Sequence, residues 1–221
     1  MARNLFYSLR SQHIIKIWQN VYQSDKGRIT LILGTFTNTY WGPIMSSRIL
    51  SFQNAYLSHS NIILAITGYI SCGNPTPTNV AIQDLSVTFA GCDSDLPNMK
   101  SLIQSIANVA ANYSVKLGMY ESGSGMVEAN AIVTGSETPG ATAKYIAFHR
   151  DPRIKNVYLN YYSMFDTFNL TENSHFAYVG LPSKYGSWFL LEYQSQNIST
   201  AYRYQAILQI INSTRSALSK P

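Results

Sequence analysis

Four short apolar runs, each followed by a stretch with helical periodicity, constrain this fold more than any other feature of the chain. The runs cover residues 29–36, 62–69, 115–121 and 175–179. They are apolar throughout rather than alternating between apolar and polar, which is typical of parallel strands that are covered on both faces. A further helical segment precedes the first run. The sequence therefore predicts an α/β fold of parallel βα units, in the order helix, then βα four times.

The segments between the runs predict where helices and loops lie in a single domain spanning residues 1–221. The helical spacing of apolar residues predicts helices at 4–22, 41–57, 96–113, 141–165 (one or two helices, with Pro152 near a junction) and 200–218. Proline, glycine and the two cysteines predict a loop over residues 70–91. A glycine- and serine-rich loop follows Glu121, and a long loop carries Pro182, Gly186 and Trp188.

Parallel βα units form either an open doubly wound sheet or part of an eight-stranded barrel. The residues after the first run are Gly34-Thr-Phe-Thr-Asn38, which is not the G-x-G-x-x-G pattern of dinucleotide-binding sheets, and no phosphate-binding loop occurs. Open sheets that bind cofactors are therefore disfavoured, and no cofactor is expected.

Composition excludes some partners. Only 12% of the 221 residues are charged, and the net charge is +5. The Lys and Arg residues are scattered along the chain and form no cluster. A nucleic-acid partner needs clustered cations, so none is expected. No run approaches the length of a membrane span, and the N-terminal residues contain no signal-peptide apolar run. The composition nevertheless fits an extracellular protein. Cys72 and Cys92 either bridge one loop or, in a reducing compartment, remain thiols.

Function in parallel βα proteins is concentrated at the carboxyl ends of strands. Glu121 ends the third run, and aromatic residues stand at the ends of all four: Tyr40 and Trp41, Tyr69, Tyr120, then Tyr178, Tyr185 and Trp188. Sugars stack their C–H faces on aromatic rings, and carboxylates cleave glycosidic bonds. The sequence therefore points to Glu121 as a catalytic carboxylate. The alternative is that Glu121 faces solvent or pairs with a lysine.

Other polar residues favour structural roles. His149-Arg150-Asp151 is interpreted as an ion-paired helix end. His175 begins the fourth predicted strand, at the end away from the expected site, and is interpreted as a buried structural histidine. Glu192 is also interpreted as structural. The four histidines and two cysteines show no metal-ligand spacing, so no metal site is expected.

Several segments resemble secreted bacterial and invertebrate proteins with a glycosidase-type (β/α)8 barrel, which often carry carbohydrate-binding modules. Lys116-Leu-Gly-Met-Tyr-Glu-Ser-Gly123 is similar to their K-L-x-x-Y-E-G-G strand. The similarity also covers Arg10–Trp18, Leu31–Gly34, Ala65–Tyr69, His149–Arg153, Tyr185–Gln194 and Tyr204–Ile210. It departs from the family at Ser122 and Phe189, where the family has glycine.

The resemblance implies that this chain is the C-terminal half, strands 5–8, of a barrel in the retaining glycosidase clan. Glu121 then falls at the end of strand seven, where the clan has its nucleophile. The acid/base glutamate of strand four, often in an Asn-Glu pair, has no counterpart, because no Asn-Glu dipeptide occurs. Tyr69 is expected to hydrogen-bond Glu121.

The implied function is therefore polysaccharide hydrolysis, with Tyr40, Trp41 and Trp188 as stacking platforms. The chain alone is expected to be inactive and to need its missing N-terminal half or to self-associate. A non-catalytic carbohydrate-binding or structural relative of glycosidases is the alternative.

Overall fold

The computed structural model describes residues 2–37, 41–54 and 62–218, and the chain divides into two compact units. The first unit comprises residues 1–68, 100–121 and 168–174. The second comprises residues 69–99, 122–167 and 175–221. Because the long helix α4 and strands β2 and β3 continue from one unit into the other, the boundary does not follow the order of the chain.

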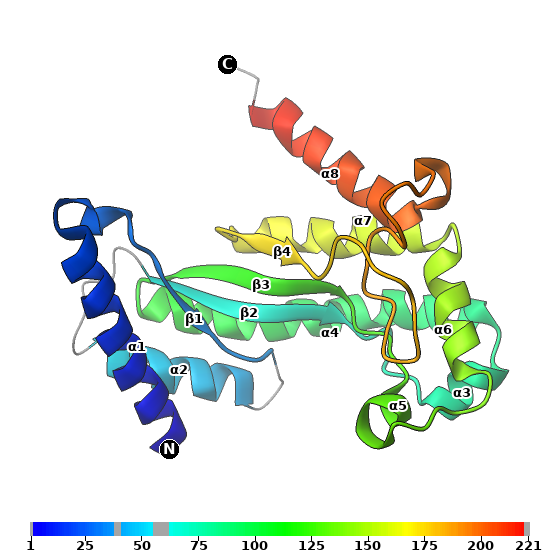
Figure 1. Cartoon of the computed structure of the whole chain (residues 1–221), viewed down its shortest axis with the longest axis horizontal. Coiled ribbons are helices and arrows are strands. Elements are labelled where there is room, and N and C mark those ends of the chain that lie inside the picture. Colours follow the sequence, from blue (N-terminus) through cyan, green and yellow to red (C-terminus); the bar gives the residue numbers. More distant parts are fainter. Residues whose placement is uncertain (1, 38–40, 55–61, 219–221) are drawn as a thin grey trace. The chain divides into compact units, whose positions relative to one another are not determined.

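Each strand is separated from the next by one or more helices (Figure 1). The strands are β1 (Leu31–Gly34), β2 (Ile62–Ile70), β3 (Lys116–Ser124) and β4 (Asn173–His175). The α-helices are α1 (Ala2–Tyr22), α2 (Trp41–Asn54), α3 (Pro77–Ile82), α4 (Leu85–Asn112), α5 (Ala129–Thr134), α6 (Ala141–Arg150), α7 (Ile154–Phe165) and α8 (Tyr202–Leu218). Short 3-10 turns cover Gln23–Arg28, Asp166–Phe168 and Ile198–Thr200.

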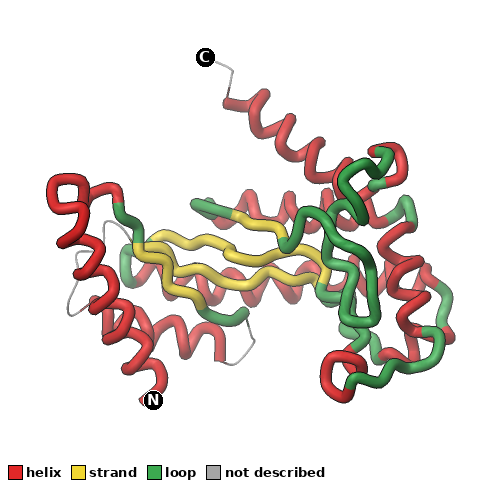
Figure 2. The backbone as a smooth tube through the Cα atoms, viewed as in Figure 1, coloured by secondary structure: helices red, strands yellow, loops and turns green. Residues whose placement is uncertain are grey.

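The four strands form one parallel sheet in the order β1-β2-β3-β4 (Figure 2). β1 and β2 run parallel in a register that pairs Leu31 with Ile62 and Gly34 with Ala65. The predicted α/β class with parallel strands is therefore confirmed. Among the described strands, sequence order and spatial order are the same.

Apolar residues of β2 form the centre of the first unit. Residues 62–66 of this strand are all buried, as the continuous apolar run predicts for a strand covered on both faces. α1 and α2 pack together, and Ser8 Oγ donates a hydrogen bond to the carbonyl oxygen of Ile49 at 3.2 Å. Gly42 of α2 lies against Ile106 of α4, where a Cβ would come within 3.1 Å of the Ile106 side chain. Glycine therefore lets these two helices approach closely.

Aromatic rings dominate the core of the second unit. Tyr158 and Tyr161 of α7 are fully buried, and the Tyr161 ring packs edge-on against Phe165 at 4.7 Å between ring centroids. Phe89 of α4 packs on Phe148 of α6 at 4.6 Å. The helical spacing of apolar residues within 141–165 predicts the buried sides of α6 and α7. The chain forms two helices there, with Pro152 at their junction, which is one of the two arrangements that the sequence predicts.

The segment predicted as a loop over residues 70–91 is largely helical. It contains α3 and the first turns of α4, which begins at Leu85 rather than near residue 96. Thr76 caps α3, because its side chain accepts a hydrogen bond from the Asn79 backbone N–H at 3.3 Å. Proline at the first helical position is also favourable. The prolines in this segment indicated a loop, and the helix predicted over 96–113 is the second part of α4, which continues through Pro97.

The fourth strand lies earlier than the sequence predicts. The apolar run predicts a strand over residues 175–179. The backbone that pairs with β3 instead runs from residue 171 to 176. At its end, the Phe176 N–H donates to the Ser122 carbonyl oxygen at 2.9 Å. The apolar run instead pairs with residues 190–191. His175 is therefore the last residue of β4, not the first. Ladder hydrogen bonds use only the backbone, so a polar strand such as Asn173–His175 leaves no hydrophobic signal.

Candidate functional site

Glu121 lies in the last part of β3, three residues before the strand ends at Ser124. Its side chain is partly exposed. The hydrogen-bonding ladder of β3 with the segment leading into β4 holds the backbone here, since Met119 N–H donates to the Glu172 carbonyl at 2.8 Å. The carboxylate thus stands near the carboxyl end of a parallel strand, although the sequence predicts that the strand ends at Glu121 and β3 continues to Ser124.

Tyr120 and Tyr69 lie on neighbouring strands of the sheet. Tyr120 precedes Glu121 on β3 and is exposed, and Tyr69 is the penultimate residue of β2 and is partly buried. Partial burial raises the pKa of Tyr120, and the negative charge of Glu121 raises that pKa further. Tyr120 therefore stays protonated and can donate a hydrogen bond at neutral pH. The predicted hydrogen bond between Tyr69 and Glu121 stays a prediction.

Trp188 lies in the long loop after β4 and is partly buried. Its ring packs edge-on against Phe176 at 6.0 Å between centroids, and Tyr178 packs similarly against Tyr204 of α8 at 5.9 Å. Phe176, Tyr178 and Tyr185 are exposed. Sequence reasoning did not single out Phe176 or Tyr204. The density of aromatic residues between 176 and 204 was the available signal.

Two further predicted residues cannot be assigned a role in the structure. Tyr40 lies outside the described residues. Trp41 is the first residue of α2, and only its backbone lies in the described part of the chain. Their proposed role as stacking platforms therefore stays a prediction.

A chain of hydrogen bonds holds the end of β3 that directly follows Glu121. His175 Nε2 lies 3.1 Å from the Trp188 carbonyl oxygen, so this nitrogen carries the proton, and Nδ1 accepts from the Tyr162 hydroxyl at 2.8 Å. The Tyr162 oxygen in turn accepts from Ser122 Oγ at 3.1 Å. Burial lowers the pKa of His175 to about 4, and the nearby positive charge of Arg203 adds to this. The neutral imidazole of His175, with its proton on Nε2, is therefore the form that makes both hydrogen bonds.

A second histidine holds the last residue of β3. His149 of α6 is buried, its Nδ1 donates to the Tyr145 carbonyl at 2.7 Å, and its Nε2 accepts from Ser124 Oγ at 2.8 Å. Burial, followed by the charge of Arg203, lowers the pKa of His149 to about 3. Ser124 and His149 resemble a nucleophile and its base, but both are buried. They therefore fix the strand end rather than meet a substrate.

Removing one hydroxyl from this network tests its contribution to stability. Tyr162→Phe leaves His175 Nδ1 without the hydroxyl that donates to it, so we expect the free energy of unfolding to fall by about 1–3 kcal/mol. Urea unfolding at pH 7.5 to 8 measures the change. Tyr185→Phe is the matched control, because this hydroxyl is on a half-exposed side chain of the same unit. Equal stability of the two variants would show that the network is dispensable.

Ion pairs hold the other charged residues that the sequence analysis named. Arg150 forms two parallel hydrogen bonds with Glu192, at 2.7 and 2.8 Å, and Arg153 pairs with Asp151 at 2.8 Å. The interpretation of residues 149–151 as an ion-paired helix end is confirmed for Arg150 and Asp151, and so is the structural role of Glu192.

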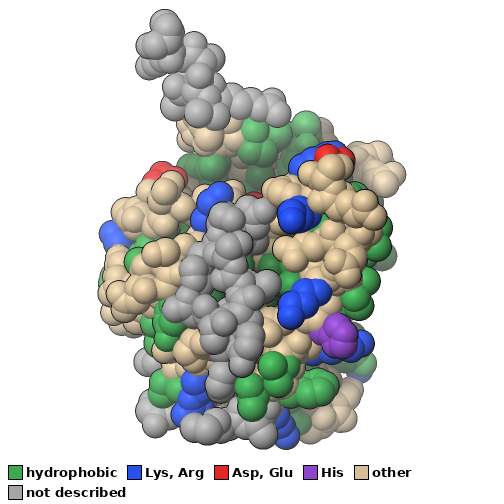
Figure 3. Space-filling view, turned by 90° about the vertical axis from the view of Figure 1, so that its left-hand side faces the viewer, with side chains coloured by type: hydrophobic (Ala, Val, Ile, Leu, Met, Phe, Trp, Pro, Cys, Tyr) green, Lys and Arg blue, Asp and Glu red, His purple; other side chains and the backbone are tan. Residues whose placement is uncertain are grey.

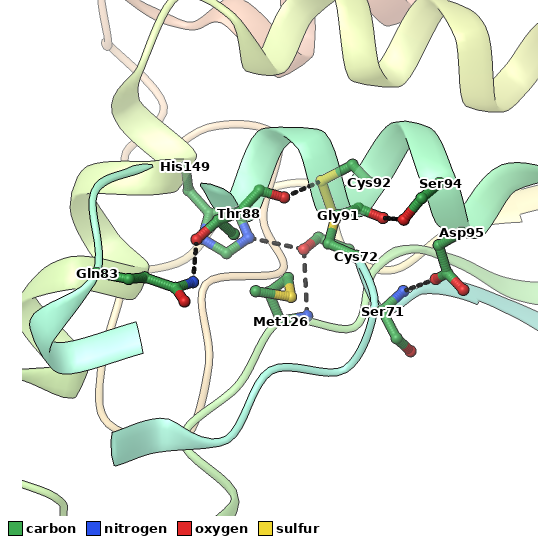
Figure 4. The surroundings of a disulfide bond; sticks show 11 residues. Ser71, Cys72, Gln83, Thr88, Gly91, Cys92, Ser94, Asp95, Met126 and His149 are labelled. Carbon is green, nitrogen blue, oxygen red and sulfur yellow. Dashed lines mark hydrogen bonds between the residues drawn. A yellow bond between two sulfur atoms is a disulfide. The ribbon is translucent and has the colours of Figure 1, made fainter. Parts of the chain in front are cut away.

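Cys72 and Cys92 form a disulfide that joins the end of β2 to α4 (Figure 4). The backbones approach so closely that a Cβ on Gly91 would overlap the Cys72 carbonyl oxygen. Asp95 accepts a hydrogen bond from the Ser71 N–H at 3.2 Å next to the bridge. The two cysteines are therefore buried and joined in a disulfide, and they are not two free thiols in a loop.

Three further findings concern metal sites, membrane spans and similar proteins. In the described part of the chain, no group of three His, Cys, Asp or Glu side chains is arranged to hold a metal ion. Residues 2–37, 41–54 and 62–218 contain no helix with the length and apolarity needed to cross a membrane. A comparison of the chain with protein-family models, curated proteins and solved structures finds no match.

Proposed function

We propose that this chain is the C-terminal half of a (β/α)8 barrel that acts on a polysaccharide, with Glu121 as the nucleophile of a retaining glycoside hydrolase. The strand order supports the barrel half. Successive βα units of a barrel place their strands in sequence order, as β1 to β4 are placed, whereas an open doubly wound sheet reverses its strand order at a switch point.

The position of Glu121 near the carboxyl end of β3 carries the functional proposal. In a retaining reaction, a carboxylate oxygen attacks the anomeric carbon while the glycosidic oxygen leaves with a proton from a second carboxylic acid, about 5 Å away. Water then hydrolyses the resulting ester. The sequence resemblance places that second acid on the N-terminal half of the barrel, so the isolated chain lacks one of the two groups that the reaction needs.

The protein is proposed to work outside the cell. The disulfide between Cys72 and Cys92 supports this location, because such bonds persist in oxidising compartments and are rare where thiols are kept reduced. Export of the full-length product to the medium, with the bridge intact by mass spectrometry, would support this location. Retention in a reducing compartment would contradict it.

A trapping reagent tests the nucleophile without the missing acid. A 2-deoxy-2-fluoroglycosyl fluoride has a leaving group that departs without protonation, so attack by Glu121 forms a stable glycosyl ester and releases fluoride. Gluco-, xylo- and manno-configured reagents cover the common polysaccharide sugars. Intact-mass analysis and peptide mapping should find one added glycosyl group on the peptide that contains Glu121. Glu121→Gln should abolish the label.

The matched control is Glu172→Gln, which removes an exposed carboxylate from the residue just before β4. This variant should be labelled like the natural chain. A label on another residue, or labelling that survives Glu121→Gln, would contradict the nucleophile.

The second candidate is a non-catalytic carbohydrate-binding protein, and the exposed rings of Phe176, Tyr178 and Tyr185 favour it. The outcome expected for this alternative is polysaccharide binding, weakened by Tyr178→Ala, with no label on Glu121. Binding is measured by affinity electrophoresis through gels that contain soluble glycans.

A further inference from the structure

Arg203 in the first turn of α8 is a buried cation. Lysine and arginine side chains normally stay in water, as the blue side chains on the face of the molecule in Figure 3 do, but Arg203 is only 4% exposed. Its Nη1 donates a hydrogen bond to the backbone carbonyl oxygen of Ser187. A carbonyl oxygen satisfies one N–H group of the guanidinium and carries no full negative charge. This hydrogen bond therefore leaves the charge of Arg203 uncompensated.

No carboxylate of the described chain compensates this charge. All 11 Asp and Glu residues lie in the part that the structure describes. None of the ion pairs found there includes Arg203. The position of Arg203 on its helix is also unfavourable, because the dipole of a helix is positive at its N-terminus. A buried charge without an opposite partner is strongly destabilising.

The titratable neighbours of Arg203 are neutral. Burial lowers the pKa of His149 to about 3 and of His175 to about 4, and the charge of Arg203 contributes to both shifts. Burial raises the pKa of the Tyr158 hydroxyl, although the charge of Arg203 acts against this shift. Tyr158 is therefore a neutral phenol rather than a phenolate that could pair with the guanidinium. The groups around Arg203 supply no negative charge.

Two buried hydroxyl groups near Arg203 lack hydrogen-bond partners. Tyr158 of α7 is fully buried, and Ser187, whose carbonyl oxygen accepts from Arg203, is 1% exposed. The described residues provide no partner for the Tyr158 hydroxyl or for Ser187 Oγ. Buried hydroxyls are normally hydrogen-bonded, and each has a proton to donate. One buried region of the second unit thus offers a guanidinium and two hydroxyl donors, but no anionic acceptor.

We infer that Arg203, Tyr158 and Ser187 form a binding site for a small inorganic anion, which is chloride. The guanidinium supplies the opposite charge, and the two hydroxyls donate hydrogen bonds to the ion. The depth of burial favours a single small ion over a sugar or a peptide carboxylate. The three residues come from α8, α7 and the loop that carries Trp188, so the bound ion links these segments. The site does not depend on the proposed carbohydrate chemistry.

Thermal unfolding of the full chain in two salts tests the site. Sodium chloride is compared with sodium gluconate, whose anion is too large for a buried site, at about 0.15 M salt and about pH 7.5. A ligand that binds only the folded state stabilises it, so the natural chain should melt about 3 °C or more higher in chloride.

Tyr158→Phe separates anion binding from a structural role of this hydroxyl. The variant should melt lower than the natural chain in chloride but not in gluconate. It should also need at least about tenfold more chloride for half of the stabilisation, because a hydrogen bond to an ion is lost. Tyr185→Phe, which removes a half-exposed hydroxyl of the same unit, is the matched control and should keep the full response. Equal destabilisation by Tyr158→Phe in both salts would contradict the site.

Chloride NMR reads the binding directly. The natural chain should broaden the chloride signal, bromide should compete for the site, and Arg203→Gln should abolish both the broadening and the effect of chloride on melting. Tyr158→Phe changes no charge, so it remains informative even where Arg203→Gln does not fold. Equal melting temperatures of the natural chain in the two salts would overturn the proposal and leave water as the partner of the two hydroxyls.

Discussion

Lowering the pH from about 8 to about 5 is expected to reduce the free energy of unfolding by about 4 kcal/mol, because a buried and a partly buried histidine are held neutral in the folded chain. Burial and the charge of Arg203 lower the pKa of His149 to about 3 and of His175 to about 4, whereas both protonate near their ordinary pKa of 6.5 in the unfolded chain. The unfolded state therefore binds more protons below pH 6.5. Stability is full above that pH, falls as the pH drops, and stops changing below the folded pKa values.

Urea unfolding at a series of pH values between about 8 and about 5 measures this loss. His149→Gln and His175→Gln should each remove about half of the pH dependence, whatever they do to absolute stability. His13→Gln, at an exposed position on α1, is the control and should keep it.

Asp84 and Asp151 contribute little to the change in stability over that range. Hydrogen bonds from Ser86 and from Arg153 lower the pKa values of Asp84 and Asp151, so their contribution is lost only in more acidic solution. Stability that stays constant from pH 8 to 5 would contradict the buried network.

Removing the disulfide is expected to lower the free energy of unfolding by about 3 kcal/mol, because the bridge restricts a loop of 20 residues in the unfolded chain. The double variant Cys72→Ala/Cys92→Ala and the natural chain in dithiothreitol should lose similar amounts in urea unfolding. Dithiothreitol should have no effect on the double variant, which serves as the control. An unchanged midpoint for the reduced natural chain would contradict a stabilising bridge.

The sequence predicted much of the secondary structure because burial on both faces leaves a continuous apolar run. β2, with residues 62–66 all buried, is found where its run predicts. The predictions that were wrong concern elements without such a signal. β4 is formed by backbone hydrogen bonds from polar residues, and α3 depends on Thr76 as its cap and on Pro77 at its first turn. Helix caps and backbone hydrogen bonds each add little to stability per residue and do not depend on apolar side chains. An analysis based on apolar periodicity therefore does not detect them.

The candidate site was likewise predicted only in part. The place of Glu121 at the end of a parallel strand followed from the sequence, since strand and direction were both encoded in the apolar pattern. The hydrogen bonds that hold the next residues did not. Ser122, Tyr162 and His175 are far apart in the chain, and only the pairing of β4 with β3 brings His175 to that end of the strand.

The sequence by itself thus determined the α/β class, the parallel direction of the strands and the position of Glu121, because each depends on short-range hydrophobic patterning. Only the tertiary structure decided that Cys72 and Cys92 are joined, that His149 is buried and His175 partly buried, and that α1 turns its polar face inward. Burial of a helix face depends on which neighbours surround it. In α1 the apolar residues are spread around the whole helix, so its sequence does not specify the buried side.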